Sequence, residues 1–117
     1  MHEYGLCEDI VAAVRRRAGG RSVRRVRVEI GVRHAAMKEP MAQAFAAAAA
    51  GTEAATATLE IVPVPASLRC RRCRTEAQTT DLLAVCPACG SDEVDLDGGD
   101  ELTLVELEYA TARAGTE

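Results

Sequence analysis

Apolar residues near the start of the chain recur at the intervals of one helix face. The i, i+3, i+4, i+7 spacing predicts an amphipathic helix over residues 4–18, and Gly19-Gly20 should end it. We expect Cys7 to lie in the core as a small apolar residue. The predicted apolar stripe consists of Tyr4, Cys7, Ile10, Val11, Val14 and Ala18.

The remaining patterns predict a second helix and three strands. Pro40 suits the first position of a helix, and the alanine run before Gly51 has a strong helix preference. Alternation predicts a half-buried strand over residues 21–31 with an arginine-rich outer face. Apolar positions farther along predict a strand around residues 59–64 and another over residues 102–109.

The second and third predicted strands flank the middle of the chain. Pro63 and Pro65 disfavour continued strand pairing, so we expect the second strand to end there. Because both strands border the same intervening segment, we expect them to pair with each other. That segment would then be a long hairpin insertion.

The intervening segment carries two matched cysteine pairs. Two residues separate Cys70 from Cys73 and Cys86 from Cys89, and twelve residues lie between the pairs. Two thiolates from each tight turn can reach one ion, which gives the tetrahedral four-sulfur shell of a structural zinc site. Gly90 suits the turn after the second pair, because positive φ costs little at glycine. The spacing therefore predicts structural Zn²⁺.

The same cysteines allow two alternatives to zinc. Paired cysteines can form disulfides, but the chain shows no secretory signal and a fifth cysteine is left over, which favours a reducing compartment. Iron also accepts four sulfur ligands, and sulfur donors alone do not separate the two metals. Aromatic residues make up only 3% of the chain, so few side chains could shield a redox iron. Zinc is preferred, and iron stays open.

Together these elements predict an α+β fold with two lobes. Two helices would cover a three-stranded sheet in a two-layer lobe formed by residues 1–65 plus 99–117. A four-cysteine zinc-ribbon lobe, residues 66–98, would be inserted into it. The acidic stretch 92–100 lacks the full calcium-loop pattern and is expected to be a solvated connection.

Composition and charge set bounds on this picture. The 117 residues are 48% hydrophobic, largely through alanine, so a bound metal would help to hold a thin core. No apolar run approaches the roughly 20 residues of a membrane span, and we expect a cytoplasmic protein.

Residues 1–74 carry 13 Lys and Arg against 7 Asp and Glu, whereas residues 75–117 carry 1 against 11. This split either steers charged partners or is neutralised when the two parts fold together.

The first three residues offer a different metal chemistry. The α-amine of Met1, the following backbone nitrogen and the His2 imidazole can close fused chelate rings around one ion. Glu3 adds a further backbone nitrogen or a carboxylate. Nitrogen donors in a plane suit Ni(II) or Cu(II), whereas structural zinc prefers a tetrahedron. The alternative is that His2 belongs to a frayed terminus without a function.

Other polar groups suggest further roles. His34 lies in a predicted loop, where solvation competes with metal ligation as its role. Four arginines near the first cysteine pair can offset the charge of a zinc–thiolate site or contact nucleic acid, so the rival hypothesis is a zinc-ribbon module that binds nucleic acid or protein. The arginines are Arg69, Arg71, Arg72 and Arg74.

The chain has no Ser/His/Asp set and no P-loop, and a four-sulfur zinc leaves no position for activated water, so we predict that it is not an enzyme.

Several of these features occur together in one order along the chain. They are Met1-His2-Glu3 at the start, Leu6-Cys7 in the first helix, Gly31 after the first strand, Phe45 in the second helix, and the four paired cysteines. In this combination, which runs to about Tyr109, the chain resembles the HypA/HybF hydrogenase-maturation nickel chaperones.

The resemblance implies two metals with different roles. Transferable Ni²⁺ would be held by Met1, His2 and Glu3, and structural Zn²⁺ by Cys70, Cys73, Cys86 and Cys89. The nickel would serve assembly of [NiFe]-hydrogenase, and in some members urease, with a hydrogenase-maturation GTPase and the hydrogenase large subunit as partners. No nucleic acid or membrane partner is expected, and the chain would be a monomer or a weak homodimer. The sequence of the loop 34–40 departs from the sequence that is usual in the family.

Overall fold

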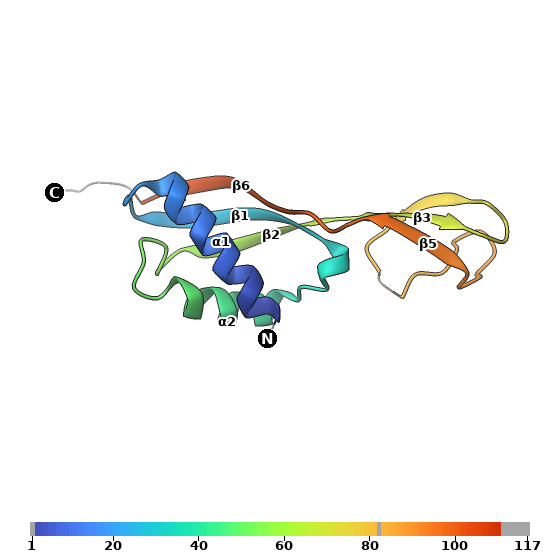
Figure 1. Cartoon of the computed structure of the whole chain (residues 1–117), viewed down its shortest axis with the longest axis horizontal. Coiled ribbons are helices and arrows are strands. Elements are labelled where there is room, and N and C mark those ends of the chain that lie inside the picture. The colour runs from blue at the N-terminus through green and yellow to red at the C-terminus, as the bar shows by residue number, and fades with distance from the viewer. Residues whose placement is uncertain (1, 82, 111–117) are drawn as a thin grey trace. The chain divides into compact units, whose positions relative to one another are not determined.

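The computed structural model describes residues 2–81 and 83–110. These residues form two α-helices, a short 3₁₀ helix and six strands, which confirms the predicted α+β class (Figure 1). None of the helices in this part of the chain is long and apolar enough to cross a membrane. The elements are α1 (His2–Ala18), β1 (Val23–Gly31), η1 (Val32–His34), α2 (Lys38–Ala49), β2 (Thr58–Val64), β3 (Ala66–Cys70), β4 (Glu76–Thr79), β5 (Val94–Gly98) and β6 (Leu102–Tyr109).

The chain divides into two compact units, each built from separate stretches of sequence. The first unit comprises Met1–Val28, Met37–Ile61 and Leu104–Glu117, and the second comprises Glu29–Ala36 and Val62–Thr103. The second unit therefore includes a segment from the first third of the chain as well as the cysteine pairs. The lobe boundaries 1–65 plus 99–117 and 66–98 stay a prediction.

One three-stranded sheet has the order β2-β1-β6. The expectation that the second and third predicted strands, β2 and β6, pair with each other is wrong, because β1 lies between them. The burial of the strands explains this order. Val26 and Val28 of β1 are fully buried, whereas Leu59 and Ile61 of β2 are only half-buried. The strand with the most apolar inner face occupies the centre, where both of its edges are paired.

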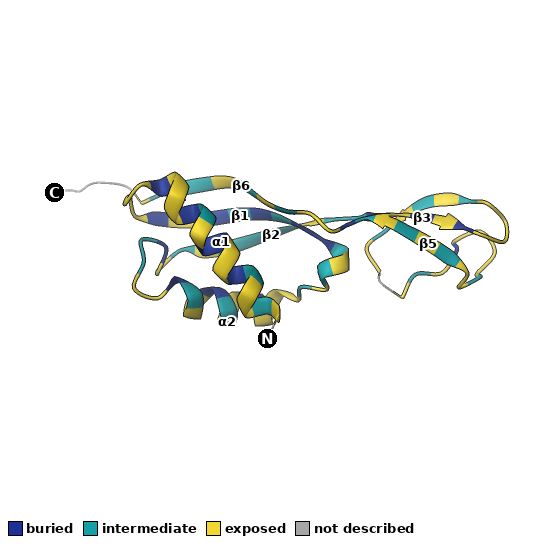
Figure 2. Cartoon of the chain, in the orientation of Figure 1, coloured by how far each residue is buried: buried dark blue, intermediate teal, exposed yellow. Residues whose placement is uncertain are grey.

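The core of the first unit lies between the helices and this sheet. Figure 1 shows α1 crossing the sheet, and Figure 2 shows buried residues along α1 and β1. The predicted stripe of α1 is buried except at Tyr4, whose side chain stays 39% exposed. Cys7 is fully buried, as expected for a small core residue. From α2 the core receives Met41, Phe45 and Ala49.

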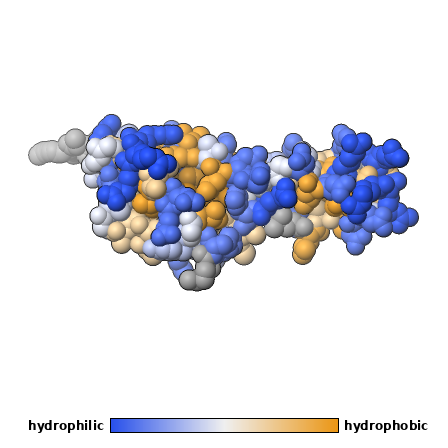
Figure 3. Space-filling view, viewed as in Figure 1, coloured by the Kyte–Doolittle hydropathy of each residue, from blue (hydrophilic) through white to orange (hydrophobic). Residues whose placement is uncertain are grey.

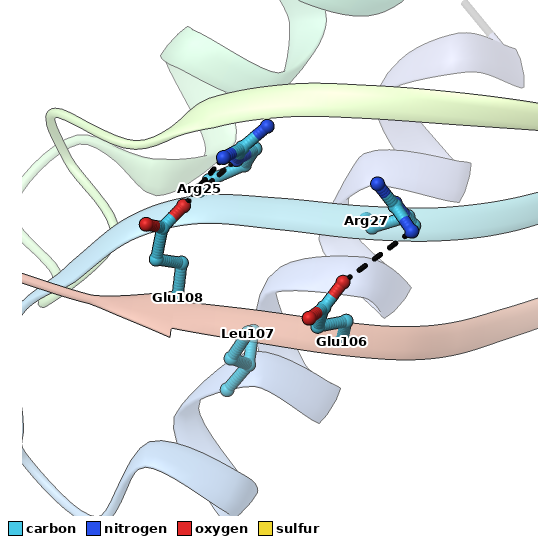
Figure 4. Close-up of a pocket in the computed structure, with 5 residues that line it drawn as sticks. All are labelled: Arg25, Arg27, Glu106, Leu107 and Glu108. Atoms are coloured by element: carbon cyan, nitrogen blue, oxygen red, sulfur yellow. Dashed lines mark hydrogen bonds and ion pairs between the residues drawn. The ribbon is translucent and has the colours of Figure 1, made fainter.

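The other face of the sheet carries charged side chains that pair with each other. Nη2 of Arg25 lies 2.7 Å from Oε1 of Glu108, and Nη1 of Arg27 lies 3.4 Å from Oε1 of Glu106 (Figure 4). These four side chains, together with Leu107, line a shallow cavity of about 280 Å³. The Leu107 side chain itself points to the opposite face of β6 (Figure 4). Arginines from the basic half of the sequence thus meet glutamates from the acidic half. On this face the charge split is neutralised within the fold, which was one of its two interpretations.

Two proline positions differ from the prediction. α2 begins at Lys38, so Pro40 is its third residue rather than its first. The difference costs little, because backbone N–H groups in the first turn have no acceptor within the helix. β2 continues through Pro63 to Val64, so Pro63 does not end it. An edge strand tolerates proline where the missing N–H would have faced away from the sheet.

A second three-stranded sheet, in the second unit, was not predicted. Its order is β4-β3-β5, and both neighbours run antiparallel to β3. Leu68 of β3 stands opposite Ala77 of β4 and Leu96 of β5. The acidic stretch 92–100 was expected to be a solvated connection, but it contains β5, whose aspartates alternate with apolar residues that pack beside β3. This sheet leads the chain into the first cysteine pair.

Candidate functional site

The two cysteine pairs lie in turns of the same backbone design. In the first turn the Cys70 N–H donates to the Thr75 carbonyl oxygen (2.9 Å), and the Arg74 N–H donates to the Cys70 carbonyl oxygen (3.0 Å). The second turn repeats both bonds, from Cys86 to Ser91 and from Gly90 to Cys86, each at 2.8 Å. The closing residue adopts positive φ in both, 68° at Arg74 and 77° at Gly90.

These turns bring the four sulfur atoms together. Sγ of Cys70 lies 3.7 Å from Sγ of Cys89, and Sγ of Cys73 lies 3.4 Å from Sγ of Cys86. All four sulfurs lie within 4.8 Å of one another. A Zn–S bond of about 2.3 Å in a tetrahedron implies an S···S edge of about 3.8 Å, so the cluster fits structural zinc. All five cysteines of the chain are free thiols, and none forms a disulfide.

Backbone N–H donors and one nearby hydroxyl group lower the pKa of three of the four thiols. The N–H groups of Cys73 and Arg72, each 3.4 Å from Sγ of Cys70, lower the pKa of Cys70. The N–H groups of Cys89 and Ala88 do the same for the pKa of Cys86. The pKa of Cys73 is lowered by the Thr75 hydroxyl, 3.0 Å from its sulfur. Thr75 was not among the predicted site residues, although a hydroxyl two residues after a cysteine is a usable signal.

The fourth thiol, Cys89, resists ionisation beside the other three. A backbone hydrogen bond at Ser91 lowers its pKa, but partial desolvation and the neighbouring sulfurs outweigh that bond and raise the pKa to about 11. Four thiolates this close repel one another unless a cation lies among them. A divalent metal ion supplies that charge and deprotonates its thiol ligands. The cluster therefore has the donors, spacing and electrostatics of a metal site.

The arginines beside the first cysteine pair fall into two groups. Nη1 of Arg69 lies 3.8 Å from a carboxylate oxygen of Glu76, and Nη1 of Arg71 lies 2.6 Å from one of Asp95. Among the described residues, no ion pair involves either of the other two, which are Arg72 and Arg74. Half of the predicted basic cluster is thus neutralised across the second sheet.

The predicted nickel ligands lie at the start of α1. Met1 is outside the described residues. His2 is the first residue of the helix, with its side chain 54% exposed, and its Nδ1 lies 3.6 Å from Oε1 of Glu3. A hydrogen bond from its own backbone N–H, aided by the nearby imidazole, lowers the pKa of Glu3. Both side chains are placed near each other, and their role in nickel binding stays a prediction.

His34 and Cys7 lie apart from the four-cysteine cluster. Nε2 of His34, in η1, is 2.9 Å from the carbonyl oxygen of Asp100. The Cys7 thiol points to Met41 in the core, 3.5 Å from its carbonyl oxygen. Burial and the Glu3 carboxylate raise the pKa of Cys7 to about 11, so it stays a neutral thiol. The structure gives neither residue a place in the metal cluster.

Comparison with known proteins gives a consistent result. A family model described as "Hydrogenase/urease nickel incorporation, metallochaperone, hypA" matches residues 1–109. The hydrogenase maturation factors HypA of Trichodesmium erythraeum and Nostoc punctiforme are 38% and 40% identical over 108 residues, covering 92% of this chain and 95% of each relative. The solution structure of the Ni metallochaperone HypA from Helicobacter pylori matches with a TM-score of 0.59 at 28% identity, covering 92% of this chain and 96% of that one. This chain therefore belongs to the HypA family of hydrogenase and urease nickel-incorporation metallochaperones.

Proposed function

We propose that this chain binds Ni(II) through Met1, His2 and Glu3 and delivers it for the maturation of [NiFe]-hydrogenase or urease. The observation that carries the proposal is the start of α1 at His2, beside a Glu3 carboxylate 3.6 Å from its imidazole. The imidazole, the backbone nitrogens and a carboxylate are then within a single helical turn. Nitrogen-rich sets of this kind suit Ni(II).

The helix start favours chelation by backbone nitrogens. The first four N–H groups of an α-helix lie outside its hydrogen-bond ladder, and the Glu3 N–H bonds the Glu3 carboxylate, so an ion bound at these nitrogens would leave the ladder of α1 intact. The exposed His2 side chain can turn toward the same ion. Nickel binding requires deprotonated nitrogens, so it should weaken in acid.

The same position makes the nickel transferable. A helix N-terminus carries about half a positive charge, which opposes a bound cation, and the Glu3 carboxylate in the first turn offsets this. The ion would be held at an exposed end of the chain, where incoming ligands can replace the donors one at a time. A closed four-sulfur site offers no such access.

The cysteine cluster would keep a separate, permanent role. Zinc held by Cys70, Cys73, Cys86 and Cys89 supplies folding energy to the second unit and offers no open coordination position. We expect the nickel to pass to a hydrogenase-maturation GTPase and the hydrogenase large subunit. The five free thiols suit the reducing conditions of the cytoplasm, where we place this transfer. The carrier would act as a monomer or weak homodimer.

Competitive nickel titration of the zinc-loaded chain tests the proposal. His2→Ala should abolish tight nickel binding, and native mass spectrometry should show that zinc is retained. His34→Ala is the matched control, since the chain has only two histidines, and it should bind nickel as the parent does. Unchanged nickel affinity in His2→Ala, or the loss of both metals together, would contradict the division of roles.

A further inference from the structure

The loop between the two cysteine turns exposes large apolar side chains. Leu83 is 86% exposed and Val85 is 51% exposed. Figure 3 shows hydrophobic surface on the second unit next to strongly hydrophilic surface. Single exposed aliphatic side chains are common on proteins, but a leucine and a valine in one short loop beside the cysteine cluster form a small apolar patch.

Side-chain hydrogen bonds engage the backbone of Asp81 and Leu83 in this loop. The Asp81 N–H donates to the Thr79 hydroxyl oxygen at 2.9 Å, and the Leu83 N–H donates to Oδ1 of Asp81 at 2.9 Å. Turns of this kind fix the backbone without burying the side chains that follow. Leu83 is therefore exposed although its own backbone N–H is hydrogen-bonded.

Two arginines next to Cys73 in the sequence have no ion-pair partner among the described residues. Arg72 and Arg74 flank Cys73, Val85 precedes Cys86, and the sulfurs of those two cysteines are 3.4 Å apart. Among the described residues neither arginine has a carboxylate partner, whereas Arg69 and Arg71 each have one. The backbone of Arg74 is fixed at φ 68°, so its side chain leaves the turn in a defined direction.

We propose that the knuckle patch, defined as Leu83, Val85, Arg72 and Arg74, docks a protein segment that presents leucine-sized apolar side chains flanked by carboxylates. An acidic amphipathic helix has this chemistry. Apolar contact would come from Leu83 and Val85, while the two arginines would select negative charge and set the orientation.

The composition of the second unit favours protein over nucleic acid as the partner. Single-stranded RNA is commonly bound by aromatic stacking together with basic side chains. The stretches 29–36 and 62–103 contain no Phe, Tyr or Trp. Exposed aliphatic side chains beside the arginines would gain little from phosphates, but they would gain from an apolar protein surface.

The test uses the zinc-loaded full chain and a fluorescent 18-residue helical peptide made of Leu, Glu and Ala, with binding measured by anisotropy. Leu83→Ser should weaken binding about tenfold. Arg72→Gln combined with Arg74→Asn should weaken it by a similar factor and remove most of its salt dependence. Asparagine tolerates the positive φ at position 74. Arg72→Glu should shift the preference toward a matched Leu, Lys and Ala peptide.

Two control variants remove similar groups elsewhere. Met37→Ser takes away an apolar side chain that is 66% exposed at the start of α2, and Arg16→Gln takes away an exposed arginine of α1. Both should bind the acidic peptide as the parent does. Mass spectrometry should confirm zinc in every variant. These outcomes are separate from nickel binding, so a failure of the nickel proposal leaves this one intact.

Several results would overturn the proposal. One is equal binding of acidic and basic peptides, or binding that Leu83→Ser leaves unchanged. Another is binding of poly(U) RNA that exceeds peptide binding and depends on the arginines alone. Self-association in analytical ultracentrifugation that Leu83→Ser abolishes would make a second copy the occupant instead. If the arginine substitutions released zinc and left peptide binding intact, the two arginines would serve only to balance the thiolate charge.

Discussion

A Cβ atom placed on Gly31 would lie 2.0 Å from the carbonyl oxygen of Gly99. The two glycines lie where the end of β1 meets the segment after β5, within the second unit. Two hydrogen bonds of 2.7 Å join these two segments. The Gly31 N–H donates to the Glu101 carbonyl oxygen, and the Arg33 N–H donates to the Gly99 carbonyl oxygen. Position 31 has ordinary φ of −65°, so close approach and not conformation requires glycine there.

Gly31→Ala should therefore destabilise the protein. Backbone atoms of residues 99 and 100 lie in the way and cannot move aside as a flexible side chain would. Overpacking of this kind costs about 1–3 kcal/mol. Chemical denaturation of the zinc-loaded chain measures the effect. Gly5→Ala is the control, since it meets nothing within 4 Å in α1 and should stabilise the helix by about 0.5–1 kcal/mol. Equal denaturation midpoints for Gly31→Ala and Gly5→Ala would contradict the close approach of Gly31 to Gly99.

Arg74 gives a second stability prediction. It closes the first cysteine turn at φ 68°, where the second turn has Gly90 at φ 77°. A left-handed conformation costs a non-glycine residue about 1–2 kcal/mol. Arg74→Gly should recover part of that cost, and Gly90→Ala should add it. Thermal unfolding of the zinc-loaded variants compares the two, and a drop in melting temperature for Arg74→Gly would show that the arginine side chain contributes more than its strained backbone costs.

The ion pairs on the open sheet face predict a dependence of stability on pH. Hydrogen bonds from Arg25 and Arg24 lower the pKa of Glu108 below its ordinary value of 4.5. A carboxyl whose pKa is lower in the folded state contributes stability above its unfolded pKa and loses that contribution as pH falls through its folded pKa. Glu108→Gln should therefore make the loss of stability less steep below about pH 4.5.

Urea denaturation between about pH 6 and pH 3 measures this slope. The control is Glu8→Gln, which changes an exposed glutamate of α1 without altering the sheet. The interpretation of Glu108 is wrong if the two variants show the same pH dependence.

Much of the fold and of the cysteine cluster was predictable because the patterns behind them are local. The periodicity of α1, the alternation in β1 and the cysteine spacing each depend on residues close together in sequence, and each appears in the structure. Membership in a metallochaperone family also confirms that the chain is not an enzyme. These features needed no knowledge of distant contacts.

The unpredicted parts depend on contacts between distant residues. β4 has only four residues, Glu76–Thr79, and little apolar alternation. β5 places aspartates at every second position, which resembles a polar loop when read alone. Only their pairing with β3 makes them strands. The position of β1 between β2 and β6 likewise cannot be read from chain order, because two strands that flank one inserted segment suggest a hairpin.

Removal of zinc should unfold the second unit selectively. Among its described residues few apolar side chains are buried, and two of these belong to Cys70 and Cys86 of the cysteine cluster. The other three in this described part are Ile30, Ala66 and Leu68. Structural zinc contributes about 10–16 kcal/mol of apparent binding energy in small zinc domains, more than this core can replace. Cys86→Ser or a strong chelator should remove the dispersed NMR signals of β3, β4 and β5 and leave those of α1 and β1. Retention of all signals without metal would contradict a structural role for zinc.

An added residue before Met1 separates chelation by the terminus from binding by side chains alone. A single glycine at the front moves the α-amine away from the His2 imidazole and breaks the fused rings, but it leaves His2 and Glu3 in α1. Nickel affinity should fall about as far as in His2→Ala, because a chelate loses most of its advantage when one ring opens. Isothermal titration of the zinc-loaded protein measures it, and Gly5→Ala serves as the control that keeps the terminus. If the extended chain bound nickel as tightly as the parent, the α-amine would not be a ligand, and His2 and Glu3 would have to hold the ion with other groups.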